Sequence, residues 1–219
     1  MIYNIFYNIY GYNILLFDYI NQFANLYLPA NMLHLVSWLF DIEMFIFYYF
    51  ILIIISIIFV IYRKSEKEYT ILYSFIVKMG LCYTVFGITY TILKFGINFP
   101  RPFCSLDSFI TTIDISKERC LSSFPSSHAG ISFITMLLLW DRMNFLSKIG
   151  AYIVVITVST ARIGFALHYP ADILYSFIIA YLIYLVYLWL YNKIEAISYK
   201  MRDIMWKIYS KENKNRADR

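Results

Sequence analysis

Stretches of about 20 apolar residues recur along this chain, and they constrain its fold more than any other feature. A helix of that length crosses about 30 Å of hydrocarbon at about 1.5 Å per residue. With 61% hydrophobic and only 15% charged residues, a chain of 219 residues cannot bury its apolar surface in one soluble core. Unpaired backbone groups are costly in lipid, and these stretches are too long and too uniformly apolar for barrel strands. We therefore predict an all-α, polytopic transmembrane helical bundle.

Charged or proline-containing links divide the apolar stretches into five predicted spans. The third is short, and Cys82 lies in the middle of the second, where it should be a free, buried thiol. The N-terminus has no Lys, no Arg and no small-residue cleavage site, so we expect no cleaved signal peptide. We expect a single integral-membrane domain, 1–219, with a core at 44–192 and spans at 44–62, 69–94, 126–141, 148–166 and 170–191.

Residues 1–43 do not fit the pattern of a spanning helix. They contain no Lys or Arg and are interrupted by six polar or helix-breaking residues, Asp18, Asn21, Gln22, Asn25, Pro29 and Asn31. We expect amphipathic segments that lie along the membrane interface. A tilted sixth span within residues 1–28 is the alternative.

Lys and Arg are distributed unevenly between the two sides of the predicted bundle. With five alternating spans, the links 63–68 and 141–148 and the basic tail 193–219 share one side with thirteen Lys and Arg residues, against five on the other. Because cytoplasmic loops carry the excess of positive charge, we expect a cytoplasmic tail and, in a bacterium, an inner-membrane protein. The same distribution argues that the net charge of +5 reflects topology and not nucleic-acid binding. Cys104 and Cys120 share the outward, periplasmic loop, where a disulfide is possible.

Three short polar segments lie at the ends of apolar stretches, on the same predicted side. They carry Lys94 and Arg101; Ser126, Ser127 and His128; and Arg162, His168 and Asp172. Singly, each residue could be an interface anchor, a helix cap or a hydrogen-bonded core histidine. For all of these residues together, such purely structural roles are less plausible, because a charged side chain at the end of a span has a free-energy cost unless it determines the topology.

The spacing of these residues suits chemistry on a phosphate ester. Pro170 favours a helix start, so Asp172 lies in an opening turn and can hold one nitrogen of His168 while the other acts as a nucleophile. Ser126 and Ser127 open another span and present N–H groups and hydroxyls to an anion. Lys94, Arg101 and Arg162 supply positive charge for a phosphoryl group. The sequence has no Asp/Glu cluster for magnesium and no His-Cys set for zinc, so we expect metal-independent chemistry without a cofactor.

The arrangement Lys-x6-Arg-Pro, Pro-Ser-x-His and Arg-x5-His-x3-Asp over residues 94–172 resembles the type 2 phosphatidic acid phosphatase superfamily. The resemblance implies that His168 forms a phosphohistidine, that Asp172 orients it and that His128 protonates the leaving oxygen. It also implies that the phosphate is bound by Lys94, Arg101, Ser126, the backbone at Ser127 and Arg162. Two residues depart from the usual pattern: Ser127 stands where Gly is usual, and Ala161 where Ser is common.

The sequence thus predicts a membrane phosphatase acting on a lipid phosphate at the outer leaflet. Undecaprenyl diphosphate, lipid A and phosphatidylglycerol phosphate are the candidate substrates that the resemblance suggests. A lipid phosphotransferase using the same intermediate is one alternative, and a non-catalytic phospholipid-binding membrane protein is another. The expected partners are the substrate lipid and the bilayer, and the sequence gives no indication of oligomeric state.

Overall fold

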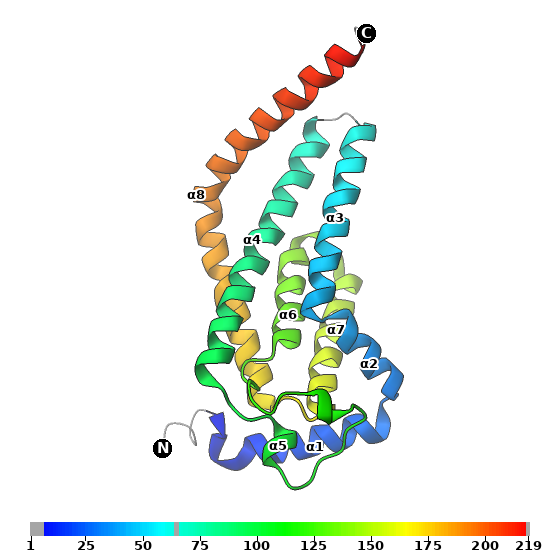
Figure 1. Cartoon of the computed structure of the whole chain (residues 1–219), viewed down its shortest axis with the longest axis vertical. Helices are drawn as coiled ribbons and strands as arrows, with labels where there is room; N and C mark the ends of the chain where they lie inside the picture. Colours follow the sequence, from blue (N-terminus) through cyan, green and yellow to red (C-terminus); the bar gives the residue numbers. More distant parts are fainter. Residues whose placement is uncertain (1–6, 64–65, 218–219) are drawn as a thin grey trace.

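The computed structural model describes residues 7–63 and 66–217, and within these ranges the regular structure is helical, apart from one isolated bridge between Pro100 and Leu121. The long helices form an elongated bundle (Figure 1). The predicted all-α class is therefore confirmed. The elements are η2 (Ile9–Gly11), α1 (Tyr12–Tyr27), α2 (Ala30–Leu39), α3 (Ile42–Arg63), α4 (Glu66–Ile97), α5 (Pro102–Ser105), η3 (Ile115–Lys117), α6 (Ser127–Leu139), η4 (Trp140–Arg142), α7 (Phe145–Gly164) and α8 (Pro170–Ala217).

Four of the described helices are long and apolar enough to cross a membrane, and they match four of the five predicted spans. The outermost is α3, of whose crossing segment only 6% is buried. Most of its residues are therefore at least partly exposed, as expected for a helix with a lipid-facing side, while Phe45, Tyr48, Tyr49 and Leu52 line a cavity shared with α4 and α6. The crossing segments are Ile42–Phe59, Tyr69–Ile97, Phe145–Gly164 and Pro170–Tyr191.

The third predicted span corresponds to α6 followed by η4, and it is short, as predicted. Helix α6 has 13 residues, which extend about 20 Å, less than the hydrocarbon thickness. It packs against α7 and α8, and a Cβ on Gly130 would collide with Tyr90 and Phe86 of α4. Because other helices cover α6, its length does not have to match that of the membrane. Its buried residues are Ser127, Ala129, Gly130, Ile131, Ser132, Ile134, Met136 and Leu138.

Helix α1 lies across the end of the bundle (Figure 1) and packs against α7. Its buried asparagines contact protein, whereas Asp18 and Gln22 are exposed. The side-chain amide of Asn21 donates to the carbonyls of Ile163 and Gly164 at 3.1 and 3.0 Å, where α7 ends. Asn13 accepts a hydrogen bond of 2.9 Å from the backbone N–H of Ala171 at the start of α8. The asparagines that interrupt the apolar pattern therefore fasten α1 to the turn between α7 and α8.

The outer face of α1 is mostly apolar and also carries the exposed Asp18 and Gln22. Leu15, Tyr19 and Leu26 are 64%, 71% and 67% exposed. A mostly apolar outer face on a helix that lies across a membrane bundle fits an interfacial position. This orientation agrees with the first of the two expectations for the N-terminal region, and α1 does not form the tilted span of the second; residues 1–6 lie outside the described ranges.

The segment between α4 and α6 folds back on itself over the same end of the bundle. Cys104 and Cys120 form a disulfide, and the backbone N–H of Arg101 donates to the carbonyl of Cys120 at 2.7 Å. These contacts fix Arg101 beside the part of the segment that leads into α6. Cys82 is buried and free, as its mid-span position predicts.

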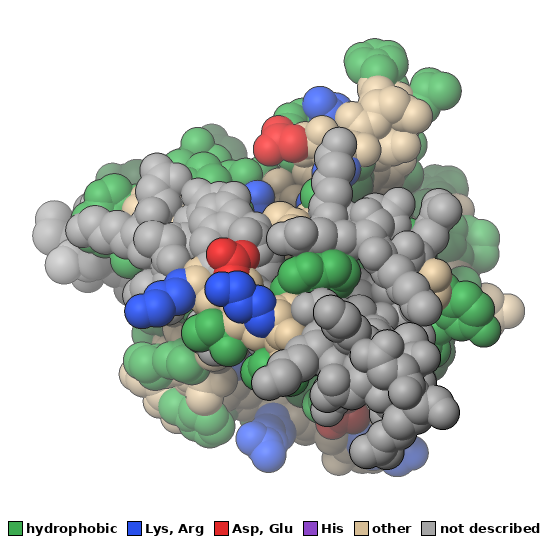
Figure 2. Space-filling view, turned by 90° about the horizontal axis from the view of Figure 1, so that it is seen from above, with side chains coloured by type: hydrophobic (Ala, Val, Ile, Leu, Met, Phe, Trp, Pro, Cys, Tyr) green, Lys and Arg blue, Asp and Glu red, His purple; other side chains and the backbone are tan. Residues whose placement is uncertain are grey.

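The opposite end of the bundle carries the end of α3, the start of α4 and the C-terminal part of α8. Helix α8 stays helical to Ala217 (Figure 1). Figure 2 looks onto this end and shows Lys and Arg side chains on it. Lys200 and Lys207 of α8 are exposed. This is the side on which the sequence predicts most of the positive charge.

Candidate active site

The predicted site residues come from separate elements that meet at the end of the bundle covered by α1. Lys94 lies in the last turn of α4 and Arg162 in the last turn of α7, while Asp172 lies in the first turn of α8. His168 belongs to the short turn between α7 and α8, Arg101 directly precedes α5, and Ser126, Ser127 and His128 open α6. The structure therefore brings all three polar segments to one place.

His168 and Asp172 are both buried, with side chains 1% and 0% exposed. The Nδ1 atom of His168 lies 3.6 Å from Oδ2 of Asp172. This distance is slightly long for a hydrogen bond, but it places the carboxylate where it stabilises a positive charge that develops on the ring. It leaves Nε2 of His168 as the nitrogen that faces away from the carboxylate.

The carboxylate of Asp172 is fixed by three donors from distant parts of the chain. The Tyr7 hydroxyl donates to Oδ1 at 2.6 Å, and the Ser123 hydroxyl and the backbone N–H of Tyr169 donate to Oδ2 at 2.5 and 2.8 Å. Such charge-assisted hydrogen bonds oppose the effect of burial, which disfavours the ionised carboxylate, and hold the carboxylate in one orientation. The orientation of the Asp172 carboxylate is therefore fixed, and the His168 ring lies against it.

The start of α6 contributes a second imidazole. Ser126 is the N-cap residue and Ser127 and His128 form the first turn, with all three side chains largely buried. The Nε2 atom of His128 lies 3.3 Å from Oδ2 of Asp41, at the junction of α2 and α3. The N-terminus of α6 thus presents backbone N–H groups, a hydroxyl and an imidazole to the same region, as an anion site requires.

Three cations surround these groups. The Lys94 ammonium approaches the carbonyl of Ser122 at 3.4 Å. Arg162 is 8% exposed and donates to the Ser37 hydroxyl at 2.7 Å, whereas Arg101, 9% exposed, pairs with the carboxylate of Glu118. Burying cations is costly, so three of them at one place indicate a site for an anion.

Buried polar atoms without a hydrogen bond concentrate at this site. Such atoms are uncommon in folded proteins and each requires an explanation. Five of the eight found among the described residues belong to predicted site residues, namely Nε of Arg101, Oγ of Ser126, Nδ1 of His128, Nε of Arg162 and Nδ1 of His168. A tetrahedral oxyanion has the acceptors that the two guanidinium N–H groups and the serine hydroxyl need.

The local electrostatics favour a neutral His168. Burial lowers its pKa well below the usual 6.5, and the charges of Lys94, Arg162 and Arg101 lower the pKa further. The ring is therefore unprotonated at neutral pH and loses its nucleophilic lone pair only when the pH falls through this lowered pKa. An uncharged imidazole among cations is the state that nucleophilic attack on an anionic ester requires.

Glu118 is an unexpected member of the site. Besides pairing with Arg101, its carboxylate acts on Arg162 and Lys94, so it lies within range of all three cations. A bound anion has to compete with this carboxylate for Arg101. We predict that Glu118→Gln strengthens the binding of inorganic phosphate about threefold to tenfold, because it removes a competing negative charge.

Calorimetric titration of the purified protein in detergent measures this effect. Asp107→Asn is the matched control, because Asp107 is an exposed acid of the same loop. Unchanged or weaker phosphate binding in Glu118→Gln would show instead that Glu118 holds Arg101 in its binding position.

Sequence reasoning did not identify Tyr7, Ser37, Asp41, Glu118 or Ser123. Tyr7 and Asp172 are 165 positions apart, and Ser37 and Arg162 are 125 apart. No spacing rule connects residues at such separations. The position of Asp41, directly before an apolar span, is the one local signal that could have drawn attention to it.

Known proteins resemble this chain in sequence pattern and in fold. A model of the PAP2 superfamily matches residues 75–196, which contain all eight predicted catalytic and phosphate-binding residues. No curated protein matches the sequence. The crystal structure of Aquifex aeolicus LpxE aligns with a TM-score of 0.59 at 20% identity, covering 81% of this chain and 94% of that one. A transmembrane PAP2 type phosphatidylglycerolphosphate phosphatase from Bacillus subtilis aligns with a TM-score of 0.54 at 18% identity, covering 86% and 88%.

Proposed function

This chain belongs to the PAP2 superfamily, and from that premise we propose that it is a membrane lipid phosphatase that hydrolyses a phosphate ester or anhydride of a lipid. The observation that carries the proposal is the cluster of unpaired, buried donors around His168. Binding of a phosphorylated lipid alone would need the cations, but not a buried neutral imidazole placed against a fixed carboxylate. The site therefore favours hydrolysis over mere binding.

In the proposed reaction, Nε2 of His168 attacks phosphorus while the bond from phosphorus to the leaving oxygen breaks. The positive charge that develops on the His168 ring is offset by Asp172, and His128 gives its proton to the leaving oxygen. His128 then takes a proton from water, whose oxygen attacks the phosphohistidine and releases inorganic phosphate. Lys94, Arg101, Arg162, Ser126 and the N–H of Ser127 stabilise the charge on the phosphoryl oxygens. No step requires a metal ion.

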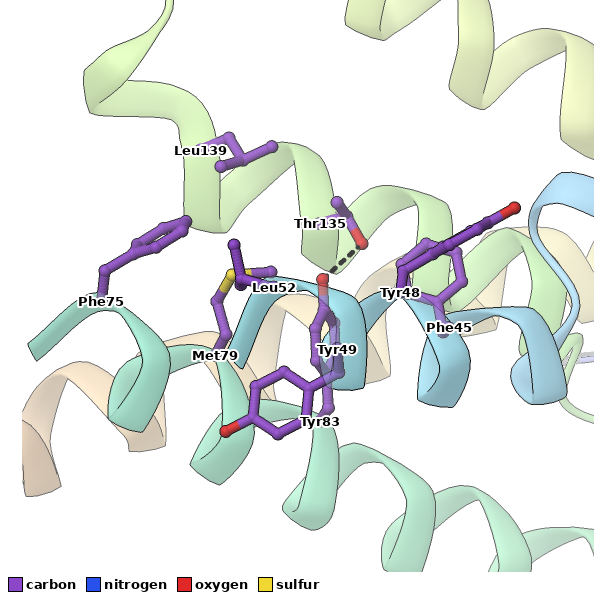
Figure 3. Close-up of a pocket in the computed structure, with 9 residues that line it drawn as sticks. All are labelled: Phe45, Tyr48, Tyr49, Leu52, Phe75, Met79, Tyr83, Thr135 and Leu139. Atoms are coloured by element: carbon purple, nitrogen blue, oxygen red, sulfur yellow. Dashed lines mark hydrogen bonds between the residues drawn. The ribbon is translucent and has the colours of Figure 1, made fainter. Parts of the chain in front are cut away.

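A lateral apolar cavity supports a lipid as the substrate. It has a volume of about 350 Å³ and lies between α3, α4 and α6 (Figure 3). Phe45 lies one helical turn beyond Asp41, and Thr135 lies two turns beyond His128, so the cavity begins close to the site and runs into the apolar part of the bundle. A lipid tail fits such a lining. The lining residues are Phe45, Tyr48, Tyr49, Leu52, Phe75, Met79, Tyr83, Thr135 and Leu139.

The candidate substrates are undecaprenyl diphosphate, lipid A and phosphatidylglycerol phosphate. The Bacillus subtilis structural neighbour is described as a phosphatidylglycerolphosphate phosphatase. At 18% identity that similarity does not select among the three. The N-terminal region and the loop from 103 to 124, which border the site, are where the specificity should be determined.

We further propose that the protein spans the bacterial inner membrane with this site facing the periplasm. The disulfide-bonded loop lies at the site end, which suits an oxidising compartment. Exposed lysines lie at the opposite end, which suits the cytoplasm (Figure 2). On this view residues 1–43 are an interfacial segment of the same single domain.

The proposal is tested by incubating the purified protein with each candidate lipid phosphate, with and without EDTA, and measuring released inorganic phosphate. We expect release from at least one lipid at a rate that the chelator does not change. No release from any phosphorylated lipid would overturn the proposed hydrolysis, and loss of release with EDTA would overturn its metal independence. Phosphate transferred to a second lipid and not to water would indicate a phosphotransferase.

A further inference from the structure

Asp41 connects the α2–α3 junction to the site. Its Oδ2 lies 3.3 Å from Nε2 of His128, and its Oδ1 accepts a hydrogen bond of 3.0 Å from the backbone N–H of Glu43. Its two oxygens therefore have separate partners, one in the first turn of α3 and one in α6. The contact with His128 is also the largest cause that lowers the pKa of Asp41 to about 2, so this carboxylate is ionised at any pH at which the protein would work.

The contact with Asp41 determines which ring nitrogen of His128 is available to a group bound in the site. With Nε2 directed to Asp41, the other ring nitrogen, Nδ1, is buried and makes no hydrogen bond. The side chain of His128 is only 12% exposed, so water does not readily take the place of a partner. The ring is thus held with Nδ1 free for a group bound in the site.

The charges around His128 make this carboxylate important. Burial lowers the pKa of His128 to about 4, and the positive charges of Arg162 from α7 and Lys94 from α4 also oppose protonation of its ring. The neighbouring imidazole of His168 is itself neutral, and Asp172 of α8 is placed against His168. Asp41 supplies the negative charge that favours protonated His128.

We propose that Asp41 is a positioning residue for the reaction: it fixes the ring of His128 with Nδ1 toward the leaving oxygen and stabilises the protonated ring that donates to that oxygen. This inference rests on the proposed function, because it assigns a partner to the general acid of that reaction. The purely structural interpretation is that Asp41 only caps α3 through the N–H of Glu43.

Asp41→Asn separates these two roles. Asparagine caps a helix about as well as aspartate, so the start of α3 is retained while the charge beside His128 is lost. Asp41→Ser, which also keeps a capping side chain, is a second variant, and Glu43→Gln is the matched control for loss of an exposed acid two positions away. Thermal unfolding in detergent establishes that each variant is folded.

The readout compares two substrates over a pH series. Dioctanoyl phosphatidic acid has an alkoxide leaving group that must be protonated. The leaving group of p-nitrophenyl phosphate, p-nitrophenolate, is a stable anion that can leave largely without protonation. With the lipid we expect Asp41→Asn to lower kcat/KM about tenfold at pH 7 and to move the alkaline limb of its pH profile about one unit toward acid, since loss of the charge makes His128 lose its proton at lower pH. With p-nitrophenyl phosphate we expect less than a twofold change.

Equal losses on both substrates in Asp41→Asn, with the alkaline limb unmoved, would overturn the role of Asp41 and leave the phosphatase proposal intact. Wild-type protein that releases phosphate from neither of these substrates nor from any of the candidate lipid phosphates would overturn both. Wild-type activity with a smaller loss on the aryl ester and a shifted limb on the lipid would support both.

Discussion

His168→Ala should lower the turnover of lipid phosphate by about 10³-fold or more, because it removes the nitrogen that the proposed mechanism uses to attack phosphorus. The other groups of the site, including the cations and His128, would remain. Substrate should therefore still bind with similar affinity, and the loss should fall on kcat. Phosphate release from the wild type and the variant at saturating substrate measures the effect.

The chain contains a suitable control for this substitution. His34 is exposed in α2, where its ring contacts Phe165 and lies 3.2 Å from the Thr112 hydroxyl. His34→Ala makes the same chemical change outside the site, and we expect its turnover to stay within about twofold of the wild type. Acid-labile, alkali-stable label from ³²P-substrate should be trapped on the wild type and on His34→Ala, but not on His168→Ala. Substantial turnover in a folded His168→Ala protein would exclude His168 as the nucleophile.

The fold could be predicted from the sequence where a single property dominates. Lipid demands long, uniformly apolar helices, and four such segments are found close to their predicted positions. The predicted third span, 126–141, coincides with α6 and η4 and is short, as predicted, but the sequence did not indicate that α4, α7 and α8 would surround it. Apolarity alone does not distinguish burial in lipid from burial in protein.

The N-terminal region shows a second limit. Its polar residues indicated an interfacial position, but the sequence did not reveal that Asn21 and Asn13 bind backbone groups at the turn between α7 and α8. A side-chain amide satisfies carbonyl and N–H groups at helix ends as well as water does. The sequence pattern shows that such residues need polar partners, but not where those partners are.

The residues that carry the proposed chemistry could be predicted from the sequence, whereas the residues that hold them in place could not. Residues that carry the proposed chemistry lie in three compact motifs, which local spacing reveals. Those that hold them, such as Tyr7 on Asp172, Ser37 on Arg162 and Asp41 on His128, come from the first 41 residues and become neighbours only through folding. The N-terminal helices are therefore a structural part of the site.

The second large effect is expected for Asp172→Asn, which should lower kcat about 10²-fold to 10³-fold. Asparagine has nearly the same shape but no charge, so it cannot offset the positive charge that His168 acquires on attack. It also places an NH₂ group among donors, because Tyr7, Ser123 and the N–H of Tyr169 all donate to the present carboxylate. At least one buried donor would then lack an acceptor, at a cost of about 1–3 kcal/mol in the free energy of unfolding.

Tyr7→Phe and Ser123→Ala separate these contributions. Each removes one donor and keeps the charge, so we expect each to lower kcat less than about tenfold while reducing the thermal stability by a comparable or smaller amount than Asp172→Asn. If Asp172→Asn loses stability but keeps near-wild-type kcat, the carboxylate serves only to join the N-terminal segment to α8. If instead kcat falls far more than in the two donor variants, the charge of Asp172 acts on His168 itself. The 3.6 Å separation of the two side chains favours this second outcome, because at that distance in a buried site a full charge strongly stabilises an imidazolium.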